Sequence, residues 1–510
     1  MPINFIPNDP LAGSSAPGER VTTKRKNRPA SRASFTFSNP SPDGTFAAGT
    51  PGFLFWQCRE AGLAALEAWE SFAGQLTRWQ GNRKKLPLLQ DVAEKLNAFY
   101  DRDSFSFFHK TIGTKTFFSG ASTDVVSHEV GHGLLDSIRP ELWDAPFLEA
   151  GAFHEAFGDC MAVLTALNDL DTRKKLLAST TTLRKRNFVE STAEELSDGI
   201  RRLQATHNAA EPRHAFNTFQ FQIPETLPDD GGPGELIDEV HSFGMVFTGC
   251  FYDLIAAIFA AQSAKTEAKL LASAKAAGAL LVEGAKTAPI TPRFFQAVGR
   301  AMVLADQQLN GGANRDRIRA AFEKHNVLLG ANAMLAPAAA LAGGAPRLGR
   351  RAAIGPATRK DLSARLGAAR GARLSVEGAE VSGQPFARVV HTQKVALGTL
   401  DNRLKGVTID ADVAVMVGAS GRRAAVMGHM PEPVSTEREV HAFVESLLSH
   451  GQIEFDGGGP RTRAAMASVA GRKEAVSRET HRVKTVGGKK ALERVRFHCR
   501  RFDRCPACER

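Results

Sequence analysis

The chain has 510 residues, of which 43% are hydrophobic and 23% charged, a composition typical of a soluble globular protein with two or three domains. Its six cysteines, three of them within residues 499–508, exclude a disulfide-rich scaffold and favour a reducing compartment. The net charge of +11 is uneven, because residues 331–510 hold 30 Lys and Arg against 17 Asp and Glu.

The first 50 residues are rich in Pro, Ser, Gly and Thr and include a basic cluster at 24–28, so we expect them to be mostly flexible. They do not show a basic stretch followed by an apolar run, which is the pattern of a secretory signal peptide. This favours a cytoplasmic protein, and secretion by a leaderless route stays open as an alternative.

Helical spacing of apolar residues begins after Gly52 and recurs as far as residue 329. It predicts helices over residues 55–76, 88–101, 117–136, 150–167, 241–261, 291–309 and 315–329. The most apolar of them carries Asp253, so we expect a buried core helix there and no membrane span.

The composition and the pattern of apolar residues change in the C-terminal third. Residues 336–371 are Ala/Gly/Pro-rich and predict a linker. Short β-branched runs at 387–397, 406–418 and 422–430, followed by a helical pattern at 437–451, predict a small α+β domain over 372–510. Its positive charge predicts a protein partner or an anionic surface, with a merely soluble basic domain as the alternative; nucleic acid is not expected.

The C-terminal tail holds one weak metal motif. His498, Cys499, Cys505 and Cys508 predict a structural zinc site, with free thiols or a disulfide as alternatives.

A stronger metal motif lies at His128, Glu129 and His132. Four helical residues turn the chain through about 400°, so both imidazoles lie on one face. Two neutral imidazoles can bind one Zn²⁺, and the glutamate between them can reach a zinc-bound water. The alternative is an ordinary amphipathic helix with one buried and one exposed histidine.

The next predicted helix offers a third ligand. Glu155 and Asp159 are again four residues apart on one face. Glu155 can ligate the metal, while Asp159 can accept the distal N–H of a ligating histidine and thereby fix its tautomer. His154 points about 100° away from Glu155, which predicts an ordinary core or surface histidine.

These segments resemble the thermolysin-like zinc metallopeptidases, or gluzincins, and the resemblance extends from Leu89 to Leu329. Residues 118–136 are similar to their zinc helix, and residues 151–159 to their third-ligand helix. Residues 239–254 resemble the segment with a transition-state histidine, which implies that role for His241. Residues 211–219 resemble the motif whose arginine binds a substrate carbonyl, which implies Arg213.

The resemblance implies a mainly helical catalytic domain over 51–335, of α+β class, with a small β-portion and the zinc helix at the floor of a cleft. It also implies one catalytic zinc bound by His128, His132 and Glu155. The expected activity is that of a metalloendopeptidase, in which Glu129 assists attack of a zinc-bound water on a peptide bond. His241 and Arg213 would stabilise the resulting oxyanion.

Two departures from the family concern substrate binding. The family has an oxyanion-binding tyrosine between the second and third ligands, whereas this chain has only Tyr100 and Tyr252, both elsewhere. Trp143 lies in the matching loop. The substrate-binding edge strand is expected to be contracted, with its Asn97-Ala98 pair inside a predicted helix.

Two further departures concern supporting residues. The carboxylate partner of the transition-state histidine would fall on Leu236, so Asp238 or Glu235 is expected to serve instead. Ala166 stands where the family has a calcium-binding carboxylate, so no calcium site is expected. The departures leave two alternatives open, a narrow-specificity processing peptidase or a catalytically weakened zinc-binding interaction protein; the intact Glu129 favours an enzyme.

Overall fold

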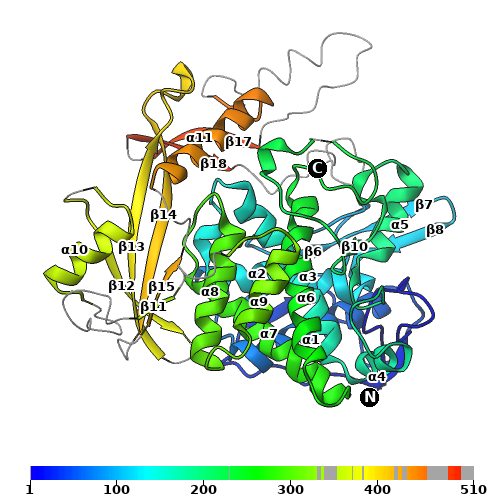
Figure 1. Ribbon diagram of the computed structural model, residues 1–510. Coiled ribbons are helices and arrows are strands. Elements are labelled where there is room, and N and C mark those ends of the chain that lie inside the picture. The colour runs from blue at the N-terminus through cyan, green and yellow to red at the C-terminus, as the bar shows by residue number, and fades with distance from the viewer. Residues whose placement is uncertain are drawn as a thin grey trace, which may run out of the picture.

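The computed structural model describes residues 2–228, 230–329, 335–337, 353–369, 371–381, 384–418, 423–427, 433–455, 480–486 and 488–494. The tail motif of His498, Cys499, Cys505 and Cys508 lies outside these residues. As predicted, the fold combines a mainly helical central part with a C-terminal part rich in sheet (Figure 1).

The N-terminal third forms a β-portion around one long helix. Its strands are β1 (Pro2–Phe5), β2 (Arg20–Thr23), β3 (Ser34–Phe37), β4 (Lys85–Leu89), β5 (Ala98–Tyr100), β6 (Phe105–Phe107), β7 (His109–Ile112) and β8 (Lys115–Phe118). Strands β3, β4, β6 and β5 form one sheet in that order, and β1–β2 and β7–β8 are separate antiparallel pairs.

The first 50 residues differ from the flexible segment that the composition predicts. Ile3 and Phe5 of β1 are buried in the main hydrophobic core. The basic cluster is also held in place: Arg25 forms ion pairs with Glu60 and Glu67 on α1 (Pro51–Ala73), 3.1 and 2.9 Å long. Polar composition therefore predicted flexibility where pairing to the acidic side of a helix gives order.

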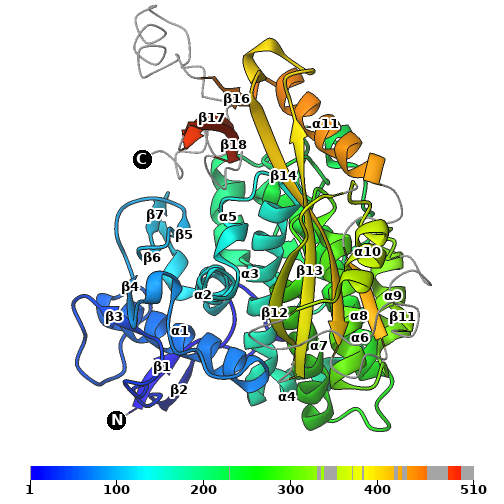
Figure 2. The same cartoon turned by 90° about the vertical axis from the view of Figure 1, so that its left-hand side faces the viewer.

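The central region is a helix bundle whose members pack on one another. It consists of α2 (Thr123–Ile138), α3 (Leu148–Asn168), α4 (Leu170–Ser179), α5 (Glu194–Leu203), α6 (Val240–Ala260), α7 (Glu267–Thr287), α8 (Phe294–Leu309) and α9 (Arg315–Lys324), with a short antiparallel pair of β9 (Ser191–Thr192) and β10 (Arg213–His214). In Figure 2, α2 lies between the β-portion and the remaining helices. Among the described residues, α6 alone is long and apolar enough to cross a membrane, and 89% of its most apolar window is buried in the protein.

The C-terminal third folds mainly as one antiparallel-rich sheet with two helices. Its elements are β11 (Leu335–Pro337), α10 (Pro356–Arg365), β12 (Ser375–Val381), β13 (Gln384–Ala396), β14 (Val407–Gly418), β15 (Arg423–Met427), α11 (Pro433–Ser449), β16 (Ile453–Glu454), β17 (His481–Val486) and β18 (Lys489–Arg494). The segment expected as a linker, 336–371, contains α10.

The C-terminal sheet packs directly on the helix bundle. The backbone N–H of Asp412 donates to Ile290 O at 2.8 Å, and Arg293 pairs with Glu439 of α11 at 3.3 Å. Apolar residues of both parts, such as Phe153 and Phe443, belong to the same buried cluster. The two parts therefore share a hydrophobic core.

Candidate active site

Two glycines allow α2 and α3 to approach closely. A Cβ on Gly131 of α2 would lie 2.9 Å from the Cα of Gly158 on α3, and a Cβ on Gly158 would lie 2.6 Å from Nδ1 of His128. Since no side chain fits at either place, the polar faces of the two helices meet at short range. Ser122 begins α2 by accepting a hydrogen bond from Val125 N at 3.3 Å.

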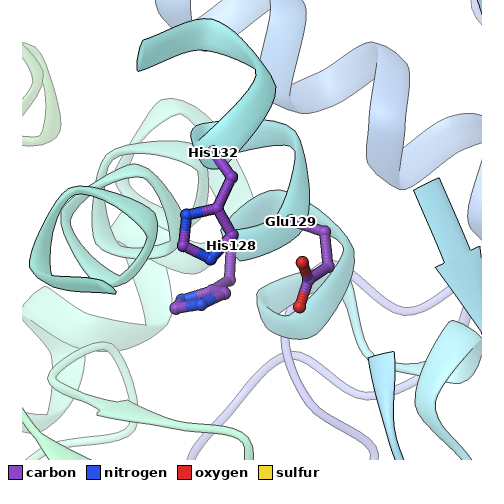
Figure 3. Close-up of side chains that lie close together, drawn as sticks. All are labelled: His128, Glu129 and His132. Atoms are coloured by element: carbon purple, nitrogen blue, oxygen red, sulfur yellow. The ribbon is translucent and has the colours of Figure 1, made fainter. Parts of the chain in front are cut away.

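On α2, His128, Glu129 and His132 each offer a ligand atom within 4.8 Å of the others. Figure 3 shows the two imidazoles side by side, with the carboxylate of Glu129 next to them. All three side chains are buried. A pattern of one buried and one exposed histidine, the alternative from the sequence, does not describe this helix.

Glu155 of α3 faces the two imidazoles. Its Oε2 lies 3.3 Å from His128 Nε2, and its Oε1 lies 3.8 Å from His132 Nε2. Two imidazole nitrogens and one carboxylate that converge on one point match the donor set of catalytic zinc. The residues His128, His132 and Glu155 therefore fit a Zn²⁺ ion.

A charged pair stands behind His128. Asp159 Oδ1 lies 2.9 Å from His128 Nδ1, so the N–H of that ring donates to the carboxylate and leaves Nε2 for a metal. Arg213 of β10 donates from Nε to Asp159 at 3.0 Å and from Nη2 at 2.8 Å. Arg213 thus holds Asp159, and its Nη1 takes no part in these bonds.

His154 has a contact that helical geometry did not predict. Its Nδ1 lies 3.1 Å from His132 Nδ1, and both rings are buried. When His132 offers Nε2 to a metal, its Nδ1 carries the proton and donates to His154 Nδ1. His154 therefore orients His132 as Asp159 orients His128. In the sequence, this contact was indicated only by the position of His154 beside Glu155, on the helix that faces α2.

His241 stands at the first turn of α6, with Nε2 3.1 Å from Glu155 Oε2. The carboxylate on its Nδ1 is Glu239, at 2.7 Å, rather than the Asp238 or Glu235 expected from the sequence. Glu239 is the N-cap of α6 and also accepts from His241 N and Ser242 N, both at 3.0 Å. Because Glu239 caps α6, its side chain folds back over the first turn and reaches the His241 ring. For this reason the partner of His241 is Glu239 and not one of the two carboxylates expected from the sequence. Glu235 instead accepts from Gly232 N.

The pKa shifts of Glu129, His132 and His241 indicate a different role for each side chain. Burial raises the pKa of Glu129 to about 7, and the charge of Glu155 adds to this, so Glu129 can accept a proton near neutral pH. Burial lowers the pKa of His132 to about 3, which keeps that imidazole neutral. For His241, burial acts to lower the pKa, but Glu155 and Glu239 outweigh it and raise the pKa to about 9.

A cavity of about 530 Å³ contains this site, and β5 contributes to its wall. Residues 88–101, expected as a helix, instead contain part of β4, a loop and β5, with Ala98 pairing to Phe107. β5 is the last strand of its sheet, so its outer edge is available to an extended peptide. Asn97 and Ala98 line the cavity, as does Tyr100, whose hydroxyl donates to Asp136 at 2.9 Å.

A second group of carboxylates lies outside the cavity. Asp9, Asp124 and Glu194 offer oxygens within 4.8 Å of one another. Burial raises the pKa of Asp9 to about 6 and that of Glu194 to about 7. The expectation of no calcium site stays a prediction.

Comparison with known proteins shows what the central region is similar to. Residues 105–333 match the family model described as fungalysin metallopeptidase (M36). No curated protein matches the chain. The matched range includes both α2 and α3, whose side chains form a group suited to zinc. The chain is therefore a zinc metallopeptidase, and its central region is similar to the fungalysin metallopeptidases and consistent with a thermolysin-like, or gluzincin, enzyme.

Proposed function

We propose that the protein is a zinc-dependent endopeptidase in which Glu129 is the general base. The observation that carries the proposal is the buried Glu129 carboxylate beside two imidazoles and Glu155, in a cavity with an edge strand in its wall. His128, His132 and Glu155 would hold the ion. A zinc ion bound there supplies Lewis-acid polarisation of a carbonyl and lowers the pKa of a water.

The chain's own residues perform the remaining steps. An extended peptide adds to the outer edge of β5 by main-chain hydrogen bonds, which needs no free terminus of the substrate. Glu129 accepts the proton of the attacking water and returns it to the leaving amine. His241, protonated and held by Glu239, donates from Nε2 to the carbonyl oxygen as that oxygen gains negative charge.

A diverse peptide mixture tests the proposal. The zinc-loaded enzyme should cleave internal bonds, a chelator should stop cleavage, and added zinc should restore it. Glu129→Gln is the matched control, because it leaves all three proposed ligands in place. Cleavage of very few sequences would favour the narrow-specificity processing peptidase. Stoichiometric zinc without cleavage of any peptide would favour the zinc-binding interaction protein and refute the proposal.

A further inference from the structure

One buried carboxylate connects the end of β5 to α2. Asp136 lies on α2, one turn after His132, and is fully buried. It accepts hydrogen bonds from the Tyr100 hydroxyl at 2.9 Å and from Arg102 Nε and Nη2 at 3.1 and 2.7 Å. These donors belong to the last residue of β5 and to the turn that follows it. Asp136 therefore holds the strand whose outer edge is proposed to bind the substrate.

Arg102 has a backbone conformation that an arginine rarely adopts. It lies in the turn between β5 and β6 with a φ of 74°, in the left-handed region where Gly, Asn or Asp is usual. Such a conformation costs free energy and persists where the surrounding structure fixes it. Here the guanidinium donates to Pro140 O at 2.6 Å as well as to Asp136. The side-chain contacts of Arg102 therefore account for an arginine in this turn.

The strand β5 has little backbone pairing of its own. It consists of Ala98, Phe99 and Tyr100 and pairs with β6 along one edge. A strand of three residues is at the short end of the usual range, and few backbone hydrogen bonds hold it. The distance between β5 and α2 therefore depends on side-chain contacts such as those of Asp136.

Trp143 packs against the same side chains from the loop between α2 and α3. Its ring lies 5.5 Å from the Tyr100 ring in an edge-to-face arrangement, and the Arg102 guanidinium lies 5.0 Å from its centroid. Trp143 and Tyr100 both line the active-site cavity. The end of β5 is therefore held between α2 and this loop.

The C-terminal hairpin of β17 and β18 holds the loop from the other side and forms a further part of the cavity wall. Arg494 Nη2 donates to Trp143 O at 3.4 Å, and His481 Nε2 donates to Pro146 O at 2.7 Å. A Cβ on Gly151 of α3 would collide with Arg494 Nη1, so only glycine leaves room for this guanidinium. Both views show the hairpin at one end of the helix bundle (Figure 1, Figure 2). The cavity wall is thus shared by β5, the loop and the hairpin.

We propose that Asp136 is a positioning residue for substrate binding, which holds β5 at the distance from α2 that an extended peptide requires. Asp136 does not line the cavity, so it acts through Tyr100 and Arg102 and does not touch the peptide. A peptide paired to the edge of β5 then presents its carbonyl to the proposed zinc ligands. The inference rests on the proposed endopeptidase function and adds the residue that places its substrate-binding strand.

Steady-state kinetics test this role on the full-length, zinc-loaded enzyme. Asp136→Asn keeps the shape of the side chain but loses the charge and one of the two acceptor oxygens. It should raise KM for a peptide that spans the cavity by about tenfold or more, and kcat should stay within about threefold. This split is expected because an edge strand binds the ground state and the transition state alike. An unchanged KM would overturn the inference. Zinc affinity should not change.

Asp103→Asn is the matched control. Asp103 lies in the same turn and pairs with Arg83 at 3.0 Å, but its side chain is 88% exposed, so KM should not change. Thermal unfolding shows whether Asp136→Asn still folds. If it does not, Tyr100→Phe decides, because it keeps the ring and removes one hydrogen bond. Tyr100→Phe should raise KM by about threefold.

Peptides with one backbone N–H replaced by an ester oxygen distinguish positioning from general destabilisation. Each peptide of the series lacks one N–H near the cleaved bond, and each is titrated into Glu129→Gln. An ester at a position that pairs with β5 should weaken binding by about 3–10-fold. With Asp136→Asn added, the same ester should weaken binding by less than about twofold, because the displaced strand no longer makes that bond. An equal loss in both backgrounds would overturn the inference.

These titrations also distinguish a failure of the inference from a failure of the proposed function. An active wild-type enzyme with equal ester losses in both backgrounds refutes the role of Asp136 alone. A wild-type enzyme that cleaves nothing, but whose ester loss disappears with Asp136→Asn, refutes the proposed function and supports the role of Asp136 in peptide binding. If no ester weakens binding to Glu129→Gln, β5 does not bind the peptide backbone, and both the proposed use of β5 and this inference are refuted.

Discussion

The contact between His132 and His154 predicts that His154 controls zinc affinity. Replacing His154 with Phe keeps a planar ring in a fully buried position but removes the acceptor 3.1 Å from His132 Nδ1. When a metal-ligating histidine loses its hydrogen-bond partner, the affinity of the site for the metal falls by about 10–100-fold. This corresponds to about 1.4–2.8 kcal/mol of binding free energy.

His154→Asn is the matched variant, because an Asn Oδ1 takes nearly the place of a histidine Nδ1. It can accept the same hydrogen bond, so its zinc affinity should stay within about threefold of wild type. Equilibrium competition with a chromophoric chelator measures both affinities. Thermal unfolding of the metal-free variants checks that each still folds.

The outcome is decisive in either direction. An affinity of His154→Phe within twofold of wild type would show that the contact between the two rings does not hold His132 for the metal. Equal losses in His154→Phe and His154→Asn would assign the effect to packing rather than to the hydrogen bond.

Three further outcomes follow from the site and its surroundings. Glu129→Gln should keep its zinc and lose turnover by about 10²–10⁴-fold, measured by steady-state kinetics and metal analysis. His241→Ala should lower kcat by about 10²–10³-fold with little change in KM, and an unchanged kcat would remove His241 from the mechanism. Asp9→Asn should raise thermal stability at pH 8 but not at pH 4, as unfolding at the two pH values would show. The raised pKa of about 6 means that Asp9 contributes stability below its unfolded pKa and loses it as pH rises through 6, by at most about 3 kcal/mol. Equal unfolding temperatures at pH 8 would contradict that reasoning.

The helices of the site were predictable because local signals agree with the tertiary structure. Around His128 and Glu155, apolar spacing and ligand spacing both indicate the same two helices, α2 and α3. The strands β13 and β14 were likewise confirmed where β-branched runs predicted strands.

The errors occur where non-local contacts decide the structure. Leu88, Val92 and Leu96 follow helical spacing, yet pairing with β6 places neighbouring residues in β4 and β5. Spacing alone cannot distinguish these outcomes for a short apolar run. Glu239 was missed because its role as the cap of α6 is a side-chain conformation, not a pattern.

Arg494 could not be found from the sequence at all. No motif connects it to α3, and its place beside Gly151 depends on how the C-terminal sheet packs on the bundle. The glycine could be read only as a helix residue of low propensity. Glycine is needed at position 151 because the guanidinium of Arg494, from a distant part of the chain, occupies the space that a side chain would fill.

The shared cavity wall also has a consequence for the order in which the enzyme is made. Translation completes α2 and α3 first, and Arg494 follows Glu155 by 339 residues. At typical synthesis rates the proposed zinc ligands exist for roughly 20 to 70 seconds before the hairpin that carries Arg494 emerges. A chain cut or released in that interval keeps the ligand set and lacks one wall of the cavity, so zinc content alone does not report a complete enzyme.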